Sequence, residues 1–289
     1  MSVAPTIGRR SHGRVSQLLF KAFLLFSLLV GFVTLGVLLV DVLKDGLPAL
    51  SWSLFTDPPS SDPEIAGARP AIIATILMML LLIVMAIPVG VATALYLEEY
   101  ANKERWYNRF LEVNIQNLAA VPSIVYGILG LAFLVRGLGL GRVLLAGAMI
   151  LTLLVLPTII IASREAIRAV PSSIRDGGLA HGATKGQVIW RQILPAAIPG
   201  IATGSILGVS RAIGETAPLL LIGAVTYISF DPTILGPFTA LPIQIYQWVR
   251  LPQAEFRELA AAAIIVLLVL LLTLNAFAIW IRNRYQKRW

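Results

Sequence analysis

The feature of this sequence that most limits its fold is a series of apolar runs, each close to or above the length of a membrane-spanning helix. A helix needs about 20 residues to cross the roughly 30 Å hydrocarbon core of a bilayer. The 289 residues are 57% hydrophobic and 13% charged, which is more apolar surface than one soluble core of this length can bury. We therefore predict an all-α, polytopic transmembrane helical bundle of about six spans, near residues 18–41, 70–97, 116–135, 142–163, 197–227 and 260–281.

The first apolar run follows basic residues, as the hydrophobic region of a signal peptide does. It is longer than the typical 7 to 15 residues of such a region, and no small-x-small cleavage site precedes Asp41. We therefore expect it to be a retained span.

Basic residues are distributed unevenly among the segments that join the spans. One set of segments carries most of them, whereas the opposite set carries Lys44, Arg69, Arg136, Arg142, Arg250 and Arg257. By the positive-inside rule, the richer side is cytoplasmic and so are both termini. The net charge of +8 is thus a topology signal, and we expect no nucleic-acid partner. The richer side holds Arg9, Arg10, Arg14, Lys21, Lys103, Arg105, Arg109, Arg164, Arg168, Arg175, Lys185, Arg191, Arg282, Arg284, Lys287 and Arg288.

Several kinds of catalytic site are absent from the sequence. It has no cysteine, and its two histidines, His12 and His181, have no companion at ligand spacing, so we expect no metal and no cofactor. It has no Gly-x-x-x-x-Gly-Lys-Ser/Thr loop to hold the phosphates of ATP, and no serine in a nucleophile elbow. We therefore expect that the chain is not an enzyme.

The connection at 164–196 lies on the basic side and contains two helix-start signals. Ser173 is followed three residues later by Asp176, and Thr184 by Gln187, each a possible capping box. We predict a short helix after Pro171, a turn between Gly178 and Gly182, and a second helix from Lys185 to Ile193 that Pro195 ends. The alternative is an amphipathic element lying on the membrane surface.

Small residues recur every fourth position in the fifth span, at Gly200, Gly204 and Gly208. This spacing places them along one face of a helix, and small residues there allow another helix to approach closely. We expect this stripe to be a helix-packing surface.

Arg211 and Glu215 lie beside that stripe, four residues apart, in a span that also contains Pro218. We expect them on one face of the same helix. A charged side chain at mid-membrane is costly, so such residues normally face protein or a wet cavity and often mark a substrate pathway. Arg211 would supply a planar fork of donors to a passing anion, and Glu215 would orient it and limit how tightly the anion binds. The alternative is a salt bridge that only fixes helix packing.

Three stretches of the sequence resemble a known family. Residues 210–220, Ser-Arg-Ala-Ile-Gly-Glu-Thr-Ala-Pro-Leu-Leu, are similar to the signature of phosphate ABC transporter permeases of the PstA type. Residues 117–127, Asn-Leu-Ala-Ala-Val-Pro-Ser-Ile-Val-Tyr-Gly, and 241–248, Leu-Pro-Ile-Gln-Ile-Tyr-Gln-Trp, are similar to other stretches of that family. The likeness runs from about Gly67 to the end of the sixth span. It implies a first segment at 1–66, with the N-terminus, first span and an outer loop, and a permease domain at 67–285.

ABC importer permeases carry a cytoplasmic motif of Glu-Ala-Ala, three residues, Gly, nine residues, and Ile-x-Leu-Pro. Here Asp176, Gly177 and Gly178 occupy the triplet, Gly182 the turn, and Leu194 with Pro195 the end, with Gln192 in the place of Ile. The spacing matches the motif and the triplet does not, since glycines weaken a helix by about 1 kcal/mol each relative to Ala. The resemblance implies that this loop docks on an ATPase subunit.

The resemblance implies an ABC importer permease fold, type I or MetI-like, in the inner (plasma) membrane. It implies a subunit that imports inorganic phosphate by alternating access and hydrolyses no ATP itself. Its expected partners are a homologous second permease, an ATP-binding ATPase dimer, an extracytoplasmic phosphate-binding protein and membrane lipid. Three alternatives stay open: a permease for another oxyanion such as sulfate or molybdate, a non-transporting scaffold or sensor, and a secondary transporter.

Overall fold

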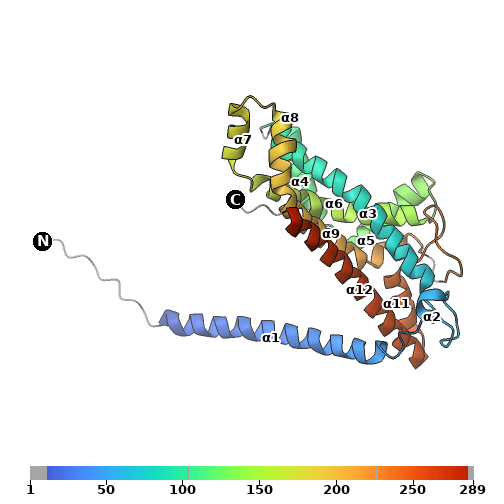
Figure 1. Ribbon diagram of the computed structural model, residues 1–289. Coiled ribbons are helices and arrows are strands. Elements are labelled where there is room, and N and C mark those ends of the chain that lie inside the picture. The colour runs from blue at the N-terminus through green and yellow to red at the C-terminus, as the bar shows by residue number, and fades with distance from the viewer. Residues whose placement is uncertain (1–11, 103, 225–226, 286–289) are drawn as a thin grey trace.

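The computed structural model describes residues 12–102, 104–224 and 227–285, and within them every regular element is helical (Figure 1). The basic residues Arg9, Arg10, Lys103, Lys287 and Arg288 of the sequence analysis lie outside the described residues. The α-helices are α1 (His12–Gly46), α2 (Ser53–Thr56), α3 (Arg69–Leu95), α4 (Trp106–Ala119), α5 (Ser123–Gly130), α6 (Leu144–Arg168), α7 (Ser172–Ala180), α8 (Lys185–Val188), α9 (Leu194–Ile213), α10 (Ala217–Leu221), α11 (Leu241–Arg250) and α12 (Ala254–Tyr285). Three π-helical turns, η1 (Tyr96–Tyr100), η2 (Leu131–Gly137) and η3 (Ile189–Ile193), continue α3, α5 and α8.

The predicted transmembrane helical bundle is confirmed. Five helical segments are long and apolar enough to cross a membrane, and a bent helix pair makes a sixth if it forms one span. The five are Ser16–Gly46, Arg69–Tyr100, Leu144–Arg168, Lys185–Ile213 and Ala254–Arg284.

The span predicted at 116–135 corresponds to a bent helix pair. The chain here forms two helices, Trp106–Ala119 and Ser123–Gly137, that meet at an angle of 106°. Pro122 stands at the break. Its ring disfavours helical backbone at the preceding residue, and it has no N–H to donate to a helix that would continue from α4.

The prediction of one span at 197–227 is wrong. The helix extends backward to Lys185 and ends at Ile213, with Gly214 as its C-cap. Pro218 then stands in the first turn of α10, where the missing proline N–H costs no hydrogen bond. Because a proline ring clashes with the carbonyl four residues before it, an uninterrupted helix through Gly214 and Pro218 would be strained.

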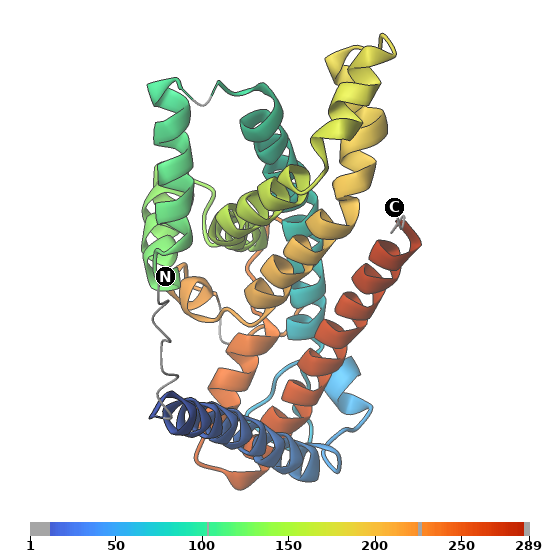
Figure 2. The same cartoon turned by 90° about the vertical axis from the view of Figure 1, so that its left-hand side faces the viewer.

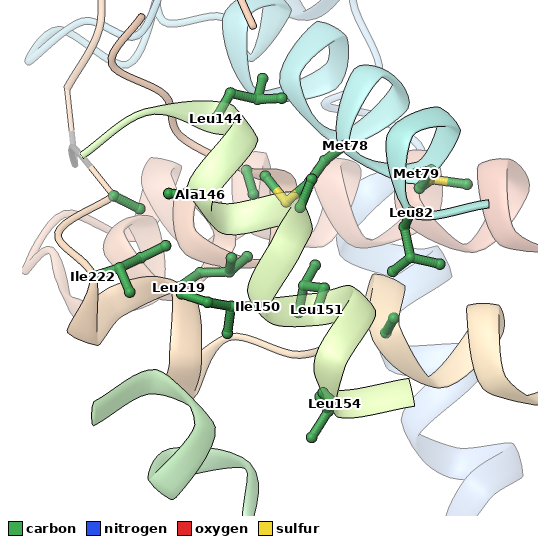
Figure 3. Packing of buried hydrophobic residues seen from close by; sticks show 14 of the residues in the cluster. Met78, Met79, Leu82, Leu144, Ala146, Ile150, Leu151, Leu154, Leu219 and Ile222 are labelled. Atoms are coloured by element: carbon green, nitrogen blue, oxygen red, sulfur yellow. The ribbon is translucent and has the colours of Figure 1, made fainter. Parts of the chain in front are cut away.

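The core of the molecule surrounds α6, which packs between α3 and α9. Figure 3 shows apolar side chains from α3, α6 and the α10 region meeting in one cluster. Its labelled members are Met78, Met79, Leu82, Leu144, Ala146, Ile150, Leu151, Leu154, Leu219 and Ile222. This cluster fixes the segment that follows α9 against the middle of the bundle.

Helix α1 lies largely apart from the bundle (Figure 1). None of its most apolar window is buried, and its contact with the remainder is at its C-terminal end, beside α12. There the approach is close, because a Cβ added at Gly46 would lie 2.7 Å from the backbone of Ala261. The apolar surface of α1 therefore has to be covered by lipid or by another chain.

The bundle has two distinct ends. Helices α7 and α8 project from one end, whereas α2, α11 and the start of α12 lie at the other (Figure 2). The two groups of candidate functional residues lie in different places, one at the break between α9 and α10 and the other at the α7–α8 end.

Candidate functional site

The first part of the site is the break between α9 and α10. Ala212 and Ile213 are buried in the core before it, and Leu219 and Ile222 are buried in the same core after it. α10 also packs closely on α5, because a Cβ added at Gly127 would lie 2.7 Å from the Cα of Pro218. The short non-helical segment is therefore held firmly on both sides.

Arg211 and Glu215 flank this break. The Arg211 Nε lies 3.5 Å from the Glu215 Oε1, so the two charges are paired although they do not share one helix. The expectation of a single helix was wrong, because α9 ends at Ile213 and Glu215 follows it in the connection. The side chain of Arg211 is 56% exposed in the isolated chain and that of Glu215 is 18% exposed.

The pairing leaves most of the guanidinium of Arg211 available. Within the described residues, Glu215 is its ionic partner, and the guanidinium makes no hydrogen bond. A guanidinium has five N–H donors, and two of them can bind two oxygens of one oxyanion at once. Its charge is thus partly neutralised while its donors remain free, which suits an anion that must bind and then leave.

A neighbouring polar contact was not foreseen from the sequence. Ser210 Oγ donates a hydrogen bond to Asn275 Oδ1 of α12 at 2.6 Å. It ties the last turns of α9 to α12 beside Arg211. The signal that could have predicted it is an asparagine inside the otherwise apolar sixth span, where a polar side chain needs a partner.

The glycine stripe of α9 faces α6. A Cβ added at Gly204 would lie 2.2 Å from the Cβ of Ala162, and one added at Gly200 would lie 2.6 Å from the Cβ of Ala166. At Gly208 the closest atom would be Cγ1 of Ile159, at 3.1 Å. The two helices therefore approach at distances that only glycine allows at the first two positions.

The second part of the site is the segment α7–α8, which forms the helical hairpin predicted from the sequence. α7 begins directly after Pro171. α8 begins with a capping box in which Thr184 Oγ1 accepts from the Gln187 N–H and the Gln187 side chain accepts from the Thr184 N–H, as predicted. Gly182 makes the turn between them at a φ of +80°, which favours glycine.

Two predictions about this hairpin were wrong. Ser173 and Asp176 form no capping box, because α7 starts with Pro171 at its N-cap and has no side-chain cap. Pro195 does not end the second helix, which continues through η3 into α9. The wider π-helical turn directly before Pro195 avoids the clash between its ring and the preceding turn of the helix.

The glycines of the triplet have different environments. A Cβ at Gly178 would lie 2.6 Å from Gln192 Oε1 and 2.8 Å from Val188 Cγ2, whereas one at Gly177 would meet nothing within 4 Å. Asp176 is exposed on the same helix, and Leu194 and Pro195 lie where η3 passes into α9. Gly178 thus allows α7 to pack closely on the second helix of the hairpin.

We expect Gly178→Ala to destabilise the hairpin and Gly177→Ala to leave it as stable or more stable. Overpacking costs about 1 to 3 kcal/mol, whereas Ala is favoured over Gly in a helix by up to about 1 kcal/mol. In a domain of this size each 1 kcal/mol shifts the melting temperature by about 2 to 4 °C. Thermal melting of the purified protein in detergent would show the difference, and equal melting temperatures for the two variants would contradict it.

A cluster of ion pairs lies beneath the hairpin and was missed by the sequence analysis. The buried Arg164 of α6 donates to Glu98 Oε1 of η1 at 2.9 Å and to Glu112 Oε1 of α4 at 2.8 Å. Arg168 also donates to Glu98, at 2.7 Å. The side chains of Arg164 and Glu98 are 6% and 4% exposed, so both charges are removed from water and depend on each other.

A second ionic contact joins the hairpin itself to η1. Arg175 of α7 donates through Nε and Nη2 to Glu99 Oε1, at 3.0 and 2.9 Å. It also donates to the carbonyl oxygens of Val170 and Ile167, at 2.6 and 2.9 Å. Arg175 therefore binds the end of the α3–η1 segment and the last turn of α6 together.

The comparisons with known proteins agree with this architecture. The family described as binding-protein-dependent transport system inner membrane component matches residues 86–289. A probable phosphate transport system permease protein PstA of Methanocaldococcus jannaschii is 30% identical over 267 residues, covering 90% of this chain and 92% of its own. The phosphate transport system permease protein PstA 1 of Mycobacterium tuberculosis is 34% identical over 218 residues, covering 75% of this chain and 70% of its own.

Solved structures of permeases have the same fold. A bacterial alginate ABC transporter, in complex with an alginate pentasaccharide-bound periplasmic protein, contains a chain with a TM-score of 0.68 and 17% identity, covering 96% of this chain and 99% of that one. A chain of the MetNI methionine ABC transporter, in an inward-facing conformation, has a TM-score of 0.60 and 18% identity. The match covers 76% of this chain and 95% of that one. The predicted MetI-like importer permease fold is confirmed.

Proposed function

Because this chain belongs to the binding-protein-dependent transport system inner membrane component family, as the predicted resemblance implied, we propose that it is the permease subunit of an ATP-driven phosphate importer. Full-length relatives bearing the name phosphate transport system permease support phosphate as the substrate. The chain is a multi-pass membrane permease, and we place it in the inner membrane with both termini in the cytoplasm, following its positive charges.

The main support for this proposal is the position and pairing of the Arg211 side chain. It stands beside a break in a membrane helix, it is paired with Glu215 at 3.5 Å, and its N–H groups make no hydrogen bond within the described residues. A guanidinium in this condition can bind phosphate oxygens bidentately as they pass. Glu215 would keep the guanidinium in place and limit the affinity, so that phosphate is released on the other side.

The proposed mechanism is alternating access driven by a separate ATPase. A homologous second permease would complete the pathway, and an extracytoplasmic phosphate-binding protein would deliver the ion at the α2–α11 end. One subunit of the ATPase dimer would dock on the α7–α8 hairpin, where Asp176, Gly177, Gly178 and Gly182 occupy the coupling motif. Because the second helix of the hairpin is continuous with α9, a movement there would reach the Arg211 break directly.

Competition during uptake tests the substrate. In proteoliposomes that hold the assembled transporter with ATP inside, a large excess of unlabelled phosphate should suppress uptake of labelled phosphate, and equal concentrations of sulfate or molybdate should not. If sulfate or molybdate competes as well as phosphate, the chain belongs to a transporter of another oxyanion. If the chain moves phosphate without any ATPase, it is a secondary transporter, and if it moves no anion it is a scaffold.

A further inference from the structure

The five residues of η1, which end the long α3 segment, are held by both halves of the hairpin. Arg175 of α7 binds the carboxylate of Glu99. Lys185, the first residue of α8, donates through Nζ to the carbonyl oxygen of the same Glu99. The Lys185 ammonium also lies 5.0 Å from the centre of the Tyr100 ring, a cation–π distance. Glu99 is therefore bound from both sides of the turn at Gly182, through its carboxylate by Arg175 and through its backbone carbonyl by Lys185.

Two of the membrane helices next to the hairpin, α9 and α3, are connected to it in different ways. α9 is a direct continuation of α8 and η3, so it must move with the hairpin. α3 has no such covalent continuity, and its attachment depends on η1. An apolar layer that includes Ala94, Ile167, Val188 and Ile193 also lies there. Apolar contacts are not directional, so such a layer can slide, whereas a guanidinium that makes several charged hydrogen bonds fixes one position.

The neighbouring ion-pair cluster around Arg164 joins different elements. Arg164, Arg168, Glu98 and Glu112 join η1 to α6 and α4, all of which belong to the bundle. None of these four residues lies on the hairpin. Glu99 and Arg175 thus form an ion pair between the hairpin and the membrane-spanning part.

We propose that Glu99 and Arg175, together with Lys185, are positioning residues that make α3 follow the hairpin when ATP drives it, an inference that rests on the proposed function. Without this connection, α9 moves with the hairpin, and α3 follows only through its packing on α6 and α9. The ATPase then continues to work on a hairpin that moves only part of the pathway. The defect is a loss of coupling, which differs from a loss of folding or of phosphate binding.

The variant Glu99→Gln tests this proposal in the assembled transporter. The measured quantity is the number of labelled phosphate ions taken up per ATP hydrolysed in proteoliposomes. We expect this ratio to fall at least about five-fold, the lower end of typical coupling effects, while ATP hydrolysis continues near the native rate. Glu99→Asp keeps the charge on a shorter side chain and should restore part of the ratio. A native ratio in Glu99→Gln would overturn the proposal.

A matched control separates coupling from a general effect of removing a carboxylate. Glu165 also pairs with an arginine, Arg168, but the pair is exposed and lies within α6. Glu165→Gln should therefore leave the ratio unchanged. If Glu99→Gln fails to accumulate in the membrane, Arg175→Lys is measured, since it keeps the charge and loses the two-donor contact. A lowered ratio in Arg175→Lys supports the proposal and an unchanged one overturns it.

A distance measurement makes the outcome independent of the substrate. The sequence has no cysteine, so spin labels on cysteines introduced at the exposed positions Ala92 of α3 and Leu179 of α7 are unambiguous. During ATP turnover their separation should stay constant in the native protein and change or broaden in Glu99→Gln. A separation that behaves identically in both would overturn the proposal. If the native complex transports sulfate and the distance between its spin labels stays constant, only the assignment of phosphate as the substrate is contradicted.

Discussion

Arg211→Gln is expected to lower ATP-driven phosphate uptake by roughly 10- to 100-fold, because one lost hydrogen bond to a charged group costs about 1.5 to 3 kcal/mol. Glutamine is polar and keeps one amide donor group, but it is shorter, has no charge and lacks the guanidinium fork of donors. Arg211 is exposed beside the break and makes no hydrogen bond within the described residues, so its replacement leaves the packing of the bundle unchanged. Assembly with the partner subunits should therefore match that of the native chain.

The control for this variant is Arg109→Gln. Arg109 is an exposed arginine of α4, outside both the break and the hairpin, so its loss should leave uptake near the native level. If Arg211→Gln transports normally, the pair with Glu215 is only structural. If it fails to assemble, the pair fixes helix packing, and the pathway assignment is lost in either case.

Gly204→Ala should have the largest effect on stability in the α9 stripe. The added Cβ would lie 2.2 Å from the Cβ of Ala162, which cannot move without its helix. Overpacking of this kind costs about 1 to 3 kcal/mol and forces α6 and α9 apart. Since α9 leads to the Arg211 break, uptake should fall together with stability.

The other two glycines provide a graded control. Gly200→Ala would bring its Cβ to 2.6 Å from Ala166, and Gly208→Ala to 3.1 Å from Ile159. We expect Gly204→Ala to lower the melting temperature in detergent most and Gly200→Ala to lower it less. Gly208→Ala should melt near the native temperature. Equal melting of Gly204→Ala and Gly208→Ala would show that α6 and α9 do not pack through this stripe.

Local signals in the sequence predicted several features correctly. Apolar run length located the spans predicted at 18–41, 70–97, 142–163 and 260–281, since the length needed follows directly from bilayer thickness. The Thr184 and Gln187 pair predicted the start of α8, because a capping box involves only residues three apart. Gly182 marked the turn because a positive φ favours glycine.

Other features depend on contacts that no local pattern contains. The break at Gly214 was missed because apolar content continues through Pro218 and beyond, and composition alone does not show where a helix stops. The partners of Arg164 and Arg175 lie more than fifty residues away in sequence, on η1 and α4. Two consecutive glutamates at the end of an apolar run were a visible signal, but the sequence gives no indication of which arginine each one binds.

Whether this chain is a subunit of a phosphate importer is decided by ATP-dependent accumulation of labelled phosphate in proteoliposomes that contain this chain, the homologous permease, the ATPase and the binding protein. We expect accumulation that requires ATP inside and phosphate-loaded binding protein outside, and that disappears when this chain is omitted from the assembly. Accumulation of phosphate at the native rate without this chain, or ATP hydrolysis by the complete complex with no phosphate moved, would contradict this assignment.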